Sequence, residues 1–139
     1  MIKFSRLADY AVVILATLAQ RDEGLMTASC ISNNTSLPEP TVSKVLKKLA
    51  GGGLLISVRG ASGGYKLAAA PENLSVAKIV VAVDGPVSLT ACVEGSEVEC
   101  DYECFCPVKG RWDGVNAAIR KSLEGISLSD MIARDIYAA

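Results

Sequence analysis

Four of the five cysteines in the 139-residue chain lie between positions 92 and 106, and this grouping is the clearest chemical signal in the sequence. The four are Cys92, Cys100, Cys104 and Cys106, whereas the fifth, Cys30, stands alone. Cytosolic thiols are kept reduced, so such a group is typical of metal binding or redox chemistry and not of a disulfide framework. We expect Cys30 to be a small buried residue with a structural role.

The spacing of these cysteines favours an iron–sulfur cluster over zinc. Zinc sites usually use pairs of the form C-x-x-C, and the chain contains no such pair. An iron–sulfur cluster accepts looser spacing because its thiolates bind different irons. The chain also has no histidine, which excludes Ser-His and Cys-His catalytic pairs and every zinc site that uses histidine. Zinc with other ligands and a metal-free thiol switch stay open as alternatives.

The segment that holds the cysteines has no hydrophobic periodicity, and regular elements are predicted on both sides of it. Apolar residues at helical spacing, together with capping residues, predict helices at about 5–20, 27–33, 39–50, 75–83, 111–124 and 128–134. Two short strands, 54–59 and 65–68, flank a glycine-rich loop and predict a hairpin. In the helix at 111–124, Val115, Ala118 and Ile119 form one apolar stripe.

The order of these elements predicts the fold class. A helix, a short helix, a turn, a third helix and a hairpin follow one another in a winged helix-turn-helix. We therefore expect a mainly α-helical protein with a small β-hairpin wing and a further C-terminal helix. The third helix, at 39–50, has one apolar side and small or cationic residues on its other sides, so it suits the major groove of DNA.

We expect the DNA contacts to come from the third helix and the wing. The candidates are Thr41, Ser43, Lys44 and Lys47 on the helix and Arg59, Ser62, Gly63 and Gly64 on the wing. Ser43 and Lys44 are the candidates for base contact, while Thr41 and Lys47 are assigned to phosphates. The alternatives are that Lys47 belongs to a solvated helix face and that the glycines serve only the geometry of the turn.

Charge and composition agree with a soluble DNA-binding protein. Positions 1–66 hold eight Lys and Arg against four Asp and Glu, whereas positions 67–139 hold six against eleven, and the net charge is −1. A basic half on an acidic protein favours contact with a polyanion. Hydrophobic residues make up 50% of the chain, enough for a core, but no apolar run is long enough to span a bilayer. No signal peptide is recognisable, so we expect a cytoplasmic protein without a membrane partner.

Four segments carry a resemblance to a known family. They are Phe4–Ala11, Leu37–Leu49, Val58–Leu67 and Cys106–Trp112. In these segments the chain resembles the Rrf-two-type transcription factors, the family of IscR, NsrR and RirA. The last segment is most similar to the branch that regulates SUF-type iron–sulfur assembly. The resemblance implies a homodimer joined through the long C-terminal helix, with an iron–sulfur cluster as the sensed ligand.

The resemblance also implies a set of cluster ligands. The family's three cysteine ligands fall on Cys92, Cys100 and Cys106, and the cluster is either 2Fe-2S or 4Fe-4S. Cys104 departs from the family, whose members generally lack cysteine at that position. The candidates for a fourth ligand are Asp9, from the first helix of the partner subunit, and Cys104.

These expectations combine into one organisation. A winged helix-turn-helix occupies residues 1–83, a cluster-binding loop residues 84–108, and a dimerisation helix with a short tail residues 109–139. We expect a DNA-binding regulator, a repressor that controls iron–sulfur assembly genes in response to cluster status, iron or oxidative stress. Its partners are an operator in double-stranded DNA and a second copy of itself; it is not an enzyme and takes no small-molecule substrate. The alternative is a cluster-free or zinc-bound regulator that uses thiols as a redox switch.

Overall fold

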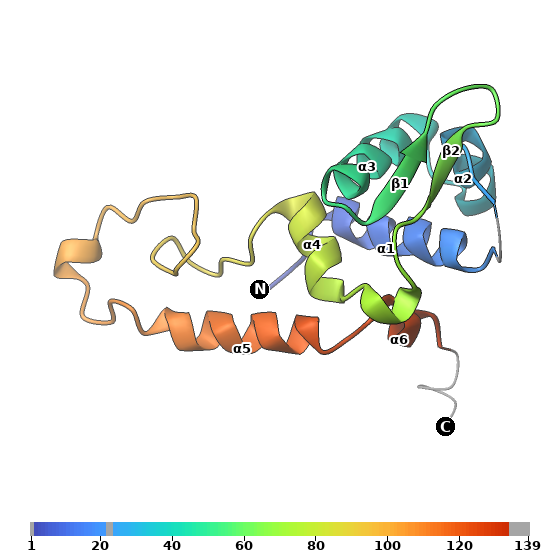
Figure 1. Cartoon of the computed structure of the whole chain (residues 1–139). Coiled ribbons are helices and arrows are strands. Elements are labelled where there is room, and N and C mark those ends of the chain that lie inside the picture. The colour runs from blue at the N-terminus through green and yellow to red at the C-terminus, as the bar shows by residue number, and fades with distance from the viewer. Residues whose placement is uncertain (1, 22–23, 134–139) are drawn as a thin grey trace.

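The computed structural model describes residues 2–21 and 24–133 (Figure 1). Its elements are α1 (Arg6–Ala19), α2 (Ala28–Thr35), α3 (Glu39–Gly51), β1 (Leu55–Val58), β2 (Gly64–Leu67), the 3-10 turn η1 (Pro71–Asn73), α4 (Val76–Asp84), the 3-10 turn η2 (Glu103–Phe105), α5 (Trp112–Glu124) and α6 (Leu128–Ile132). The predicted helices and the hairpin are therefore present in the predicted order. The predicted end of the last helix, at 134, lies outside the described residues.

Side-chain caps explain where three of the helices begin. The hydroxyls of Ser5, Thr27 and Ser75 each accept a hydrogen bond from an amide in the first turn of α1, α2 and α4. The second helix ends at Thr35, two residues later than predicted. The helix ends where Ser36 adopts a left-handed conformation (φ +62°) and its amide donates to the Ser32 carbonyl.

The core is aliphatic and lies mainly between α1, α3 and α4. Its fully buried members include Ile14, Leu15, Val45, Leu46, Leu49 and Ile79. The hairpin packs against α3 and pairs in antiparallel register from Leu55 opposite Leu67 to Val58 opposite Gly64. This packing fixes α3 and the wing on one side of the molecule (Figure 1).

Residues 85–111, which connect α4 to α5, are called the cysteine loop below. Figure 1 shows the loop and the start of α5 extending away from the body that α1 to α4 form. The chain then returns, because Leu128 of α6 is completely buried in the core and its amide donates to the Leu74 carbonyl over 2.7 Å. Across the described residues, no helix combines the length and apolar content that crossing a membrane requires.

Candidate nucleic-acid interface and cysteine loop

Helix α3 presents its polar side to solvent. Its buried stripe consists of Val42, Val45, Leu46 and Leu49, which hold the helix on the core. Lys44 and Lys47 are exposed, and Thr41 and Ser43 are half-buried. The side of α3 that faces away from the core thus carries the residues that the sequence assigns to DNA.

A groove of about 490 Å³ lies between the wing and the adjoining parts of α2 and α3. The start of α2, at Thr27 and Ala28, forms one wall, and Lys47, Arg59 and the wing glycines form the others. Amides at the start of a helix carry partial positive charge, and the two cationic side chains add to it. The lining of the groove is therefore electropositive.

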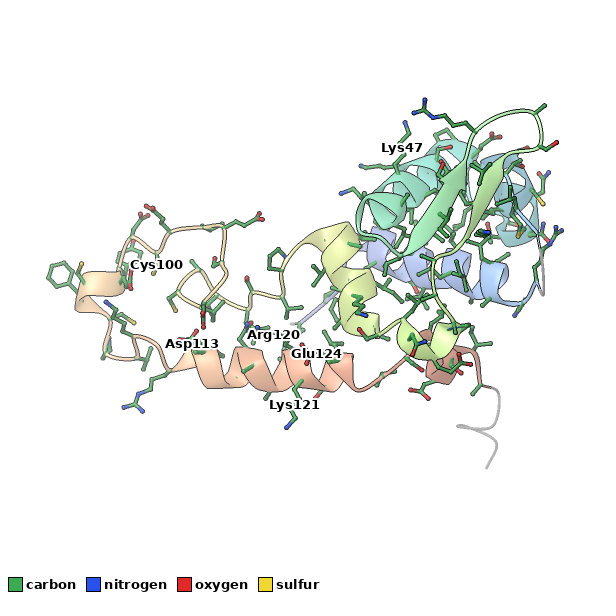
Figure 2. The ribbon with its side chains drawn as sticks, viewed as in Figure 1. Lys47, Cys100, Asp113, Arg120, Lys121 and Glu124 are labelled. Atoms are coloured by element: carbon green, nitrogen blue, oxygen red, sulfur yellow. The ribbon has the colours of Figure 1, made fainter. Side chains whose placement is uncertain are left out.

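The side chains of the two neighbouring lysines of α3 make different contacts. Lys47 lines the groove and lies beside the wing in Figure 2. The ammonium group of Lys48 instead donates to the Val83 carbonyl at the end of α4, over 3.2 Å. A cation at that position is favourable because the end of a helix carries partial negative charge. Of the two, only Lys47 is placed to meet a ligand in the groove.

The wing glycines have a packing role. A Cβ atom on Gly63 would lie 2.2 Å from the Val58 carbonyl oxygen, and one on Gly64 would lie 2.8 Å from the Met26 carbonyl oxygen. Gly64 also has a φ of +149°, which side chains rarely adopt. Close backbone contacts therefore favour glycine at both positions, within the turn for Gly63 and against Met26 for Gly64. Ser62 and Arg59 remain exposed on the wing.

The structure does not bring the predicted cysteine ligands together. Cys92, Cys100 and Cys106 are half-buried and Cys104 is exposed, and all four are free thiols. In the part of the chain that the structure describes, no three Cys, Asp or Glu side chains lie close enough to hold a metal ion. Figure 2 shows Cys100 far out on the loop. The remaining candidate, Asp9, is exposed in the first turn of α1.

Cys30 is less buried than the sequence predicts. It is half-buried on α2, whose one fully buried residue is the next one, Ile31. Its sulfur lies 3.9 Å from the Arg21 guanidinium and 3.6 Å from the Asn34 side-chain amide. Cys30 is turned by about 100° from Ile31 around the helix, so only part of its surface packs against the core.

Two residues of α5 and one of the loop itself, none of them singled out by the sequence analysis, make hydrogen bonds at the start of the cysteine loop. The Asn116 side chain accepts from the Leu89 amide (2.9 Å) and donates to the Val87 carbonyl (2.8 Å). Asp113 accepts from the Glu94 amide at 3.0 Å. The Thr90 hydroxyl lies 3.3 Å from the Cys92 sulfur, within hydrogen-bonding distance. The one available signal was an asparagine between Val115 and two alanines of a helix.

Comparison with known proteins decides the class of this protein. The model of the Rrf2 family, described as an iron-dependent transcriptional regulator, matches residues 4–134. The chain belongs to the Rrf2 family. The regulator IscR of Aliivibrio salmonicida is 30% identical over 131 residues, which cover 94% of this chain and 77% of that protein.

Solved Rrf2-family structures have the same fold. CymR of Bacillus subtilis, described as its global cysteine regulator, is 28% identical, with a TM-score of 0.72 over 95% of this chain and 97% of CymR. IscR of T. potens is 31% identical, with a TM-score of 0.68 over 94% of this chain and 86% of the other. The predicted winged-helix fold and family are confirmed. Members of the Rrf2 family are transcriptional regulators and not enzymes, and this protein is therefore a transcriptional regulator.

Proposed function

We propose that this Rrf2-family regulator represses iron–sulfur assembly genes and senses cluster status, iron or oxidative stress through an iron–sulfur cluster held by Cys92, Cys100 and Cys106. The observation that carries the proposal is the presence of these three half-buried, free thiols on one loop between α4 and α5. The description of the family as iron-dependent supports it. The 2Fe-2S and 4Fe-4S forms are both compatible with three cysteines and one further ligand, Asp9 or Cys104.

The proposed DNA contacts follow from the groove between α3 and the wing. Ser43 and Lys44 contact base edges in the major groove, and Thr41 and Lys47 contact phosphates. On the wing, Arg59 and Ser62 reach the backbone, while Gly63 and Gly64 let the hairpin come close to it. The ligand is a double-stranded operator with two half-sites about 34 Å apart, or a multiple of that distance.

The proposed homodimer is supported by an uncovered apolar stripe on α5. Trp112 and Val115 are 43% and 45% exposed, and Ile119, one turn further along the same side, is half-buried. A row of apolar side chains on a helix is usually buried against another apolar surface. The same apolar stripe on a second copy of the chain would provide such a surface. The dimer then presents two copies of α3 to the two half-sites.

The donor set of the loop fits an iron–sulfur cluster in its chemistry. Thiols are the usual protein ligands of such clusters, and the loop contains only one short 3-10 turn, so its cysteines can approach one another. When bound, the cluster supplies a redox-active and oxygen-sensitive centre. The Thr90 hydroxyl would donate to the Cys92 sulfur, and hydrogen bonds to ligand sulfurs raise the reduction potential.

The proposed switch acts through the order of the cysteine loop. With its thiols held together, the loop fixes α5 relative to α4, and therefore fixes the spacing of the two α3 helices in the dimer. With its thiols free, the loop is more mobile and the spacing changes. A coupling free energy of about 1–3 kcal/mol would change operator affinity roughly five- to 150-fold.

The test begins with iron and acid-labile sulfide analysis of the full chain after anaerobic purification. We expect both elements, together with visible absorption that disappears in air. Operator affinity is then measured with and without the cluster, on a duplex selected by the chain from random sequence. Equal affinities would contradict the switch but leave DNA binding intact, and material that cannot be reconstituted with iron and sulfide would contradict the sensor.

A second candidate is a cluster-free or zinc-bound regulator that uses thiols as a redox switch. It is favoured by Cys104, an exposed free thiol two residues from Cys106. The metal analysis separates the two candidates, because zinc without sulfide, or colourless metal-free protein whose operator affinity changes on thiol oxidation, would support the second one.

A further inference from the structure

Helix α5 holds the first part of the cysteine loop through two side chains on one face. Asn116 bonds both to the Leu89 amide and to the Val87 carbonyl, and Asp113, one turn earlier, accepts from the Glu94 amide. Within the described residues, Asn116 is the one polar or charged side chain that is buried, with 1% of its surface exposed. Figure 2 shows Asp113 on the loop side of α5 and Lys121 on the opposite side.

The rest of the loop lacks such attachments. From residue 95 to residue 108, the hydrogen bonds that the structure gives join residues of the cysteine loop to one another. The ion pair between Lys109 and Glu103, with 3.2 Å between its charged atoms, is also internal to the loop. The loop therefore has an anchored part, residues 87–94, and an outer part, residues 95–108. Cys92 belongs to the anchored part, and the other three cysteines belong to the outer part.

We propose that Asn116 and Asp113 are positioning residues that hold Cys92 in a fixed position beside α5. When the thiols bind a shared ligand, the outer cysteines then move toward Cys92. The proposal rests on the proposed function, since it concerns the same cysteines. It adds that one of the ligands is placed in advance. It also connects that ligand to the helix proposed to join the dimer.

The burial of Asn116 explains why this anchor is rigid. A buried amide side chain is tolerated when its donor and acceptor are both satisfied, and Asn116 has a partner for each. Releasing the segment would break both of these part-buried hydrogen bonds, which costs free energy. The neighbouring Val93, 5% exposed, adds apolar packing on the same segment. Cys92 thus lies between an anchored Leu89 and an anchored Glu94.

The test uses the full chain and two variants, Asn116→Leu and Asp113→Ala. Asn116→Leu keeps the shape of the side chain but removes both hydrogen bonds. Asp113→Ala changes an exposed residue, so this variant still tests the proposal if Asn116→Leu does not fold. The control is Glu124→Ala, which removes an exposed acid from the same helix. Amide hydrogen exchange and thiol alkylation are measured in the metal-free protein. Iron retention is measured after anaerobic reconstitution.

We expect the Leu89 and Glu94 amides to exchange more slowly than those of the outer part, and Cys92 to alkylate more slowly than Cys100 or Cys106. Asn116→Leu should speed exchange at Leu89, and Asp113→Ala at Glu94, each about five- to tenfold. Cys92 should alkylate several-fold faster and reconstituted protein lose iron faster, while the control matches the unmodified chain.

Two results would overturn the proposal. One is equal exchange in the anchored and outer parts of the unmodified chain, which would mean that no anchor exists. The other is a variant that loses amide protection but retains iron as long as the unmodified chain, because the contacts would then have no part in positioning. An unmodified chain that takes up no iron would instead refute the proposed function, and the exchange and alkylation results would still decide whether Cys92 is anchored.

Discussion

Lys47 and Lys48 are adjacent in the sequence, yet their ammonium groups lie on different sides of α3. Lys47 borders the groove beside the wing, and Lys48 donates to the Val83 carbonyl of α4. Helical geometry turns consecutive side chains by about 100°, so one can face DNA while the other faces the protein. The pair therefore offers a matched comparison at the scale of single residues.

We predict that Lys47→Met weakens binding to a mixed-sequence duplex several-fold and lowers the slope of log affinity against log salt by about one, because one phosphate contact is lost. Fluorescence anisotropy over a range of salt concentrations measures both quantities. Lys48→Met, which removes the same charge, should leave the slope unchanged. Equal slopes for the two variants would rule out the assignment of Lys47 to a phosphate.

At the scale of elements, α5 combines contacts to the cysteine loop with a neighbouring apolar stripe that is partly exposed. Asn116 and Asp113 face the cysteine loop, while Trp112 and Val115 are largely uncovered. The sequence predicts an apolar stripe on this helix at Val115, Ala118 and Ile119. Val115 and Ala118 are exposed in the single chain and Ile119 is half-buried, so the stripe does not join the protein's own core. This is the arrangement that a helix shared between two subunits requires.

We predict that Val115→Glu converts the dimer into monomers at micromolar concentration, because the new carboxylate would be buried without a partner in the dimer. Sedimentation velocity gives the oligomeric state. Ala117→Glu is the control, since it adds the same charge at an exposed position on a different side of α5. If Val115→Glu stays dimeric, the dimer does not use this stripe.

At the scale of the whole molecule, the end of the chain closes the fold. Leu128 is buried to 0% exposure, and the segment before it pairs with the start of α4, where the Val76 amide donates to the Ile126 carbonyl over 2.8 Å. Helix α5 is thus attached to the body formed by α1 to α4 in two ways: through the segment that follows its C-terminal end, and through direct contacts with α4. A shift of α5 would therefore be transmitted to α3 through a packed core and not through a flexible tail.

We predict that Leu128→Ala lowers the free energy of unfolding by about 2–5 kcal/mol, the usual cost of a cavity at a fully buried leucine. Urea denaturation followed by circular dichroism measures it. Met131→Ala, on the same helix at a residue that is 53% exposed, should change the unfolding free energy much less. Similar losses for both variants would mean that α6 does not depend on Leu128 to dock.

Local pattern was sufficient for the elements and for part of the candidate site. The spacing of apolar residues placed α1, α3 and α4 to within about two residues, because burial of one face repeats with the helical period. The hydroxyl caps at Thr27 and Ser75 were visible for the same local reason. The order of the elements then indicated the winged helix, and with it the exposed side of α3.

Contacts between distant positions were decided by the tertiary structure alone. Lys48 meets Val83, 35 residues away, and Asn116 meets Val87 and Leu89, almost 30 residues away. The hydrophobic periodicity of the sequence does not predict such pairs, since they depend on how α4, the cysteine loop and α5 pack. The sequence by itself determined which helices form and which residues could bind DNA or iron. Packing decided that Lys47 and not Lys48 faces the groove, and that Cys92 is anchored while the other loop cysteines are not, because a side chain's partners are set by the elements brought against it.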